Sequence, residues 1–148
     1  DSFGSMIFNV VMIGLIPAFG EELLFRGVVQ KLFTQWTKNA HWGIWIAAAM
    51  FSALHGQFYG FFPRMALGGL LGYLLLWSGS LWLPVLAHFI NNGAAVVVTY
   101  LIQRGNIPKE AENIGTGEDE LYYIFSSAVL VFVLIGMVYK KRERELVG

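Results

Sequence analysis

The sequence contains no cysteine and few charged residues. Among its 148 residues Cys is 0, which excludes disulfides, a thiol nucleophile and thiolate metal sites. Charged residues make up 14% of the chain and the formal net charge is zero. The basic residues form no broad stripe that could follow a phosphate backbone, so we do not expect nucleic acid as a partner. The chain also opens without an initiator methionine or a signal-peptide pattern, and we therefore expect it to be a segment of a longer protein.

Apolar residues dominate what is present. Hydrophobic residues are 56% and aromatic residues 16% of the chain, far above the balance of a soluble domain of this size. Runs of about 18 or more apolar residues are long enough to cross a bilayer as helices. We therefore predict an all-α, polytopic membrane helix bundle that forms a single membrane-embedded core over residues 1–148. About five helices are predicted, from the apolar stretches Phe3–Phe33, Trp42–Phe58, Met65–Trp77, Leu81–Ile102 and Leu121–Tyr139.

The first and third stretches depart from a simple span. The first is too long for one crossing, and it contains Pro17 and Gly20. We expect these residues to bend or break it, leaving a helix that starts near Ala18. The third stretch, Met65–Trp77, is short, so we expect it to be tilted or to cross the bilayer only in part.

The connections between stretches predict how the chain is oriented. Gly60–Pro63 and Ser78–Ser80 read as short turns, and residues 104–120, which are rich in glycine and acidic side chains, as an exposed loop. The tail, residues 140–148, is basic and follows the last apolar run directly. Cytoplasmic flanks of membrane helices carry an excess of Lys and Arg, so this tail predicts a cytoplasmic C-terminus.

Ionisable side chains that interrupt the apolar stretches are the most informative residues. A charged side chain at the bilayer centre costs about 2.5 to 3.5 kcal/mol on translocon scales. Such residues therefore pair with one another or serve a function. In this chain they are Glu21, Glu22, Arg26, His55 and His88, with Asn91 and Asn92 shortly after the second histidine.

Two neighbouring glutamates are expected to differ in their partners. Glu22 and Arg26 are four residues apart, with the acid toward the N-terminus, the spacing and direction that favour an ion pair on a helix. Glu21 lies about 100 degrees around the helix from Glu22, so one arginine cannot serve both in the same way. We expect Glu21 to be the carboxylate left available for chemistry, as a general base.

Two histidines beside this carboxylate allow two kinds of chemistry. Glu21 with His55 could deprotonate a water, and His88 with Asn92, which share a helix face, could donate hydrogen bonds to an oxyanion. Alternatively Glu21, His55 and His88 could bind a divalent metal such as zinc. The sequence lacks the HExxH pattern of zincins. Spacing alone does not separate the two mechanisms.

Three short motifs resemble one protein family. EELLFR at Glu21–Arg26 resembles the EExxxR motif of the type II CAAX prenyl endopeptidases and their bacterial relatives, a group that includes bacteriocin-processing enzymes. FSALH at Phe51–His55 resembles that family's FxxxH motif, and HFINN at His88–Asn92 its HxxxN motif. The motifs occur in the family's order within separate apolar stretches. The resemblance covers about residues 17–92.

The resemblance implies an all-helical intramembrane protease with a polar cavity. It implies that Glu21 with His55 activates the attacking water and that His88 with Asn92 stabilises the oxyanion. Glu22 and Arg26 match the remaining motif positions and would support this site. Since asparagine is a poor zinc ligand and a natural oxyanion donor, we favour a mechanism that requires no cofactor over a metal-dependent one.

The bacterial character of the motifs also bears on substrate and location. We expect a peptide or a membrane protein as substrate, rather than a prenylated protein, and the bilayer as the solvent. The predicted location is the bacterial inner membrane, as an integral membrane protein.

Two other functions are compatible with parts of the sequence. An ion-coupled transporter would also place Glu and His inside the membrane, but it predicts an inverted repeat, which the sequence does not show. A membrane immunity or scaffold protein would keep the fold and act by binding. A changed motif residue at Glu21, His55 or His88 would favour that reading, and all three are present.

Overall fold

The computed structural model describes residues 2–56, 58 and 60–109, and in these ranges the chain is helical without a strand. The first helical run, Phe3–Thr37, has 35 residues and alternates between α-helix and the wider π-helix. Its parts are α1 (Phe3–Asn9), η1 (Val10–Leu15), α2 (Ile16–Glu22), η2 (Leu23–Val29) and α3 (Gln30–Thr37). Three further helices follow: α4 (Ala40–Leu54), α5 (Phe61–Ser78) and α6 (Trp82–Gln103). The predicted all-α class is confirmed.

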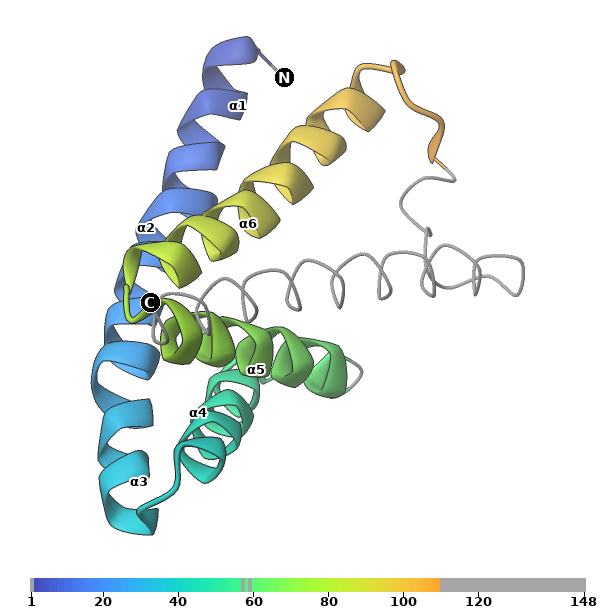
Figure 1. Ribbon diagram of the computed structural model, residues 1–148. Helices are drawn as coiled ribbons and strands as arrows, with labels where there is room; N and C mark the ends of the chain where they lie inside the picture. The colour runs from blue at the N-terminus through green and yellow to red at the C-terminus, as the bar shows by residue number, and fades with distance from the viewer. Residues whose placement is uncertain (1, 57, 59, 110–148) are drawn as a thin grey trace.

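Pro17 does not break the first run, so the prediction of a separate helix starting near Ala18 is wrong. The ribbon bends gradually along this run (Figure 1). Proline has no N–H, so it cannot bond to the carbonyl four residues earlier, and that carbonyl, Ile13 O, accepts a hydrogen bond from Asn92 Nδ2 at 3.4 Å. The preceding π-helix closes with its own bond, from the Ile16 N–H to Val11 O. The helix continues because a neighbouring helix serves the carbonyl that proline leaves open.

Tight corners separate the remaining helices. After α3, Lys38 adopts a left-handed conformation with φ 52°, and the Asn39 side chain accepts hydrogen bonds from the N–H groups of His41 and Trp42 to begin α4. Between α5 and α6, Gly79 has φ 68°, a conformation that glycine adopts without a steric penalty. The predicted turn at Ser78–Ser80 is therefore confirmed.

The third apolar stretch forms a longer helix than predicted. α5 begins at Phe61 and has 18 residues, whereas α4, with 15 residues, is the shorter apolar helix. The predicted turn over Gly60–Pro63 is wrong from Phe61 on, because α5 begins there and Pro63 lies in its first turn, where the missing N–H needs no partner. Length therefore gives no reason to expect α5 to cross the bilayer only in part.

Glycines allow the helices to approach closely. A Cβ added to Gly68 would lie 3.1 Å from Ala48 Cβ, and one added to Gly72 would lie 2.8 Å from Ile44 Cγ2. These two glycines of α5 thus bring it against α4 in the manner that small-xxx-small spacing predicts. A Cβ on Gly14 would lie 3.4 Å from the backbone nitrogen of Gly93, which brings η1 against α6.

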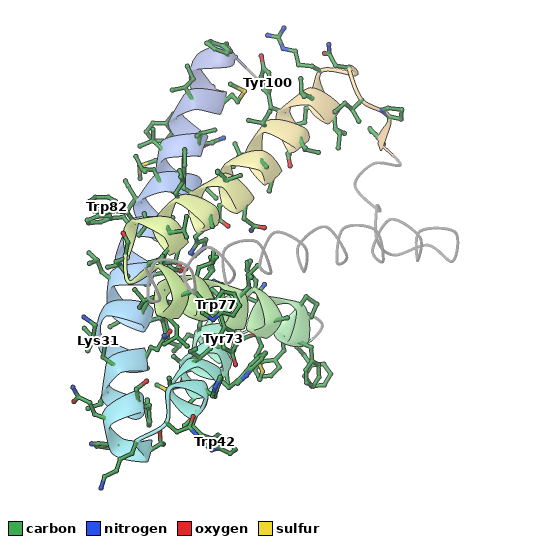
Figure 2. The ribbon with its side chains drawn as sticks, in the orientation of Figure 1. Lys31, Trp42, Tyr73, Trp77, Trp82 and Tyr100 are labelled. Carbon is green, nitrogen blue, oxygen red and sulfur yellow. The ribbon has the colours of Figure 1, made fainter. Side chains whose placement is uncertain are left out.

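The arrangement is open, with a small interior and an apolar exterior. In Figure 1, α3, α4 and α5 lie together at one end, while α6 runs beside the first half of the long helix. Large apolar side chains point outward, among them Phe8 at 63%, Ile90 at 57% and Trp42 at 63% exposed. Trp42 is labelled near the start of α4 in Figure 2. Three helices, Phe3–Thr37, Phe61–Ser78 and Trp82–Gln103, are long and apolar enough to cross a membrane.

Part of the predicted organisation lies outside the described residues. The fifth stretch, Leu121–Tyr139, and the basic tail, residues 140–148, fall there, as does most of the predicted acidic loop, residues 104–120. Of that loop, residues 104–106 and 108–109 are exposed. The described helices therefore give four of the five predicted apolar segments.

Candidate active site

Glu22 and Arg26 form a fully buried ion pair. Arg26 Nη1 lies 2.9 Å from Glu22 Oε1, and the two side chains are 2% and 0% exposed. Arg26 Nη2 donates a second hydrogen bond to Gly68 O at 2.9 Å, and the guanidinium carbon lies 4.9 Å from the centre of the Phe51 ring. The predicted pair is confirmed, and it ties the first helical run to α5. Buried charges are tolerated when they are paired and hydrogen-bonded in this way.

His88 lies between the two neighbouring glutamates. Its Nδ1 is 2.8 Å from Glu22 Oε1, and its Nε2 is 3.7 Å from Glu21 Oε2. A carboxylate that already receives an arginine hydrogen bond acts as an acceptor, so the His88 Nδ1 carries a proton. The ring is 3% exposed and is held edge-on against Phe51 at a centroid distance of 5.8 Å. Glu22 therefore fixes the ring so that Nε2 faces Glu21.

The two glutamates differ in exposure as well as in their partners. Glu22 is completely buried, with 0% exposure, whereas the Glu21 side chain is 31% exposed. Both belong to the last turn of α2, immediately before the second π-helix. The Glu22 carboxylate is paired with Arg26 and His88. The Glu21 carboxylate faces the cavity described below.

His55 lies at the C-terminal end of α4, whereas Asn92 lies within α6. His55 is the residue that ends α4, and its ring is exposed. Its Nδ1 bonds to Phe51 O at 2.8 Å, and since a carbonyl only accepts, Nδ1 carries the proton and Nε2 is left as an acceptor in the neutral ring. Asn92 donates to Ile13 O through Nδ2 and accepts from Asn91 Nδ2 at 3.2 Å. These bonds leave the second Nδ2 proton of Asn92 available.

A cavity of about 670 Å³ brings these residues together. Glu21, His55, His88 and Asn92 all line it, with Phe51 between the two histidines. From there it extends between α1 and α6, past Tyr100, which lies near the far end of α6 (Figure 2). Polar side chains about one turn apart line this extension on both helices: Ser5 and Asn9 on α1, and Thr99 and Gln103 on α6.

The detailed contacts differ from the pairs named from the sequence. Glu21 Oε2 approaches His88 Nε2, whereas His55 is bonded to Phe51 O. Glu22, which is paired with Arg26, bonds to His88. This pair therefore supports His88 rather than Glu21 and His55. Spacing within single helices could not reveal contacts that depend on how α6 crosses α2.

Phe51 and Arg64 are among the cavity residues that sequence reasoning did not assign to the site. Phe51 was treated only as a motif position, although its ring contacts His55 at a centroid distance of 4.9 Å as well as His88 and Arg26. Arg64 also lines the cavity, at the start of α5. An isolated arginine directly after Pro63 was the signal that could have identified Arg64 as a cavity residue. It was overlooked because Gly60–Pro63 was predicted to be a turn outside the helices.

The described residues hold no preformed group of three metal ligands. Within residues 2–56, 58 and 60–109, no three His, Asp or Glu side chains converge as a ligand set. In the alternative set Glu21, His55 and His88, each histidine has its Nδ1 engaged, His88 by Glu22 and His55 by Phe51 O. Nε2 is therefore the nitrogen of each ring that could act as a base, a donor or a metal ligand.

Comparisons with known proteins place these residues in a family. The family described as "Type II CAAX prenyl endopeptidase Rce1-like" matches residues 3–94. An uncharacterized protein of Bacillus subtilis, YpbD, is 37% identical over 86 residues, which are 55% of this chain and 41% of that protein. The chain thus spans less than half the length of this relative. No solved structure matches the chain.

The family match contains the four residues assigned to the site from the sequence. It covers more than half of the chain and includes Glu21, His55, His88 and Asn92. Three of the described helices are long and apolar enough to cross a membrane. The chain is therefore an integral membrane protein, and it belongs to the type II CAAX prenyl endopeptidase Rce1-like family.

Proposed function

We propose that this chain is the catalytic core of an intramembrane endopeptidase. The observation that carries the proposal is the single cavity between membrane helices that Glu21, His55, His88 and Asn92 line together. A carboxylate, two imidazoles and an amide that line one cavity are the groups that peptide hydrolysis needs. Membership of a protease family supports hydrolysis in general, and the roles below are our assignment.

In this proposal Glu21 and His55 activate the attacking water. Glu21 accepts a proton from the water, and His55 Nε2 accepts the water's other hydrogen as a hydrogen bond. The water oxygen forms a bond to the peptide carbonyl carbon while the carbonyl electron pair moves onto its oxygen. When the tetrahedral intermediate collapses, the C–N bond breaks and Glu21 returns its proton to the leaving amine. The tautomer that Phe51 O imposes on His55 supports the accepting role.

His88 and Asn92 then stabilise the oxyanion. Asn92 donates its second Nδ2 proton, while its first stays on Ile13 O. His88 donates through Nε2, which requires the doubly protonated ring, and the carboxylates on its two nitrogens accommodate that charge. Donors placed in advance of the reaction in a site of low dielectric stabilise the transition state without reorganisation.

The substrate in this proposal is a peptide or a segment of a membrane protein. The cavity lies between helices that face lipid, so the scissile bond reaches it from the membrane or its interface. The reaction as assigned requires no metal. We propose the bacterial inner membrane as its location, with a cytoplasmic C-terminus.

Cleavage of a reporter peptide library by the full-length protein in liposomes tests the proposal. We expect Glu21→Gln and His55→Ala each to lower kcat at least about 100-fold while both proteins remain folded by circular dichroism. Gln35→Ala, an exposed change near the end of α3, is the matched control and should cleave normally. A wild-type protein that cuts nothing, with or without added metal, would exclude the protease in favour of a binding protein.

A further inference from the structure

Arg64 is a charged cavity residue outside the three motifs. Among the described residues that line the cavity it is the one Lys or Arg, and Glu21 is the one Asp or Glu. Arg26, the other arginine nearby, is enclosed by Glu22, Gly68 and Phe51. Arg64 is therefore a positive group in the cavity lining that the proposed hydrolysis does not use.

The position of Arg64 is set by the start of α5. Arg64 and Leu67 both line the cavity, and since they are three residues apart they share one face of the helix. The guanidinium turns back toward the helix N-terminus, over Gly60, where an added Cβ would lie 3.1 Å from Nη2 and 3.3 Å from Nη1. Gly60 precedes α5 in the connection that follows His55. Arg64 thus lines the cavity from the helix that follows His55 in the chain.

We propose that Arg64 binds a carboxylate of the peptide substrate and thereby selects which bond is presented to Glu21. A guanidinium matches a carboxylate with two parallel hydrogen bonds, and this pairing is strong where water is scarce. The carboxylate comes either from the C-terminus of the substrate or from an Asp or Glu side chain near the scissile bond. This inference rests on the proposed function in taking the cavity as the peptide-binding site.

The test measures peptide binding rather than cleavage, in the full-length Glu21→Gln protein in neutral detergent. The probes are a fluorescent eight-residue apolar peptide with a free C-terminal carboxylate, the same peptide as its C-terminal amide, and the amide with one internal Asp. We expect one of the two carboxylate-bearing probes to bind about 10- to 100-fold more tightly than the plain amide, the range for hydrogen bonds to charged groups. The preferred probe identifies the source of the carboxylate.

Three additional substitutions assign this preference to Arg64. Arg64→Gln should reduce it to within about twofold, and Gly60→Ala should weaken it in part, because the new methyl displaces the guanidinium without changing charge. Arg104→Gln, which removes an equal charge at the exposed end of α6 outside the cavity lining, should leave it intact.

Either of two results would overturn the inference. The first is equal or absent binding of all three probes by the parent protein, and the second is a preference that persists in Arg64→Gln. Failure of the proposed function looks different, because it would leave a carboxylate preference that Arg64→Gln removes in a protein whose wild type cleaves nothing.

Discussion

Adjacent residues in this chain have opposite environments, and the difference follows from helix geometry. Glu21 and Glu22 are 100 degrees apart on the helix, so one faces the cavity and the other faces η2 and α6. Glu22 is held by Arg26 and His88 at 2.9 and 2.8 Å. Glu21 has its nearest described partner at 3.7 Å. The burial that makes Glu22 structural is what leaves Glu21 available to react.

Removing Glu22 should therefore damage the fold more than removing Glu21. Glu22→Ala leaves Arg26 buried without its counter-charge, and breaking a buried pair in this way costs about 3 to 5 kcal/mol. Glu21→Ala, at a position 31% exposed, should cost about 1 kcal/mol or less. The free energies of unfolding are measured by steric trapping in bicelles. Adding Arg26→Met to Glu22→Ala should recover part of the loss, and equal losses for the two single variants would contradict this division.

Asn92 is tested by exchanging its amide for a carboxylate. Asn92→Asp keeps the shape of the side chain but replaces a donor by an acceptor, so it can serve neither Ile13 O nor an oxyanion. In the proposed mechanism kcat falls about 100- to 1000-fold, the cost of losing one oxyanion donor. Gln35→Glu, the same kind of change at an exposed position of α3 outside the cavity lining, is the control. Steady-state cleavage of a reporter peptide measures both, and a loss below tenfold in Asn92→Asp would remove Asn92 from the oxyanion site.

At the scale of helices, the tightest contact lies between α3 and α4. A Cβ on Gly43 would be 2.8 Å from both Gln30 O and Thr34 N, and these are backbone atoms that cannot move aside. Gly43→Ala should therefore destabilise the protein by about 1 to 3 kcal/mol.

Gly20→Ala provides the matched control for this contact. No atom lies within 4 Å of a Cβ at Gly20, and alanine is the better helix former, so it should gain about 0.5 to 1 kcal/mol. Thermal unfolding in detergent compares the two variants. A Gly43→Ala protein as stable as the wild type would mean that α3 and α4 can separate without cost.

How far the sequence predicts the helices depends on what ends each of them. The predicted turn at Ser78–Ser80 was correct because Gly79 stops the helix by its own backbone preference. The prediction at Pro17 failed because the fate of the Ile13 carbonyl depends on Asn92, 79 residues away. Pro63 was misplaced for a related reason, since proline is compatible with both a turn and the first turn of a helix. Local signals were reliable where the deciding partner was local.

The sequence predicted which residues belong to the candidate site, but not which of them bond to each other. The cost of polar groups in lipid singled out Glu21, His55 and His88, and all three line one cavity. That His88 Nδ1 bonds to Glu22, 66 positions away in the sequence, follows from the crossing of α6 with α2. No single-helix pattern encodes that crossing. Pairings between helices had to come from the structure.

At the scale of the whole molecule, α6 has one face toward the cavity and another that is apolar and exposed. His88, Asn92 and Thr99 line the cavity, while Leu86 and Ile90 are 53% and 57% exposed. Residues 88 and 90 lie about 200 degrees apart around the helix, so the exposed set points away from the site. Polar residues on one face and bare apolar residues on the other indicate that the second face meets lipid or another membrane helix.

Ile90→Arg tests this assignment, because the position is near the middle of α6 and remote from the helix ends. An arginine at the centre of a membrane helix costs about 2.5 to 3.5 kcal/mol, so the fraction of protein that resists alkaline carbonate extraction should fall. Ile90→Leu, which keeps the side chain apolar, should insert as the wild type does. Unchanged insertion of the arginine variant would mean that this face borders water. In that case α6 would have polar surroundings on both sides, and the cavity would be a surface groove rather than a site enclosed in the membrane.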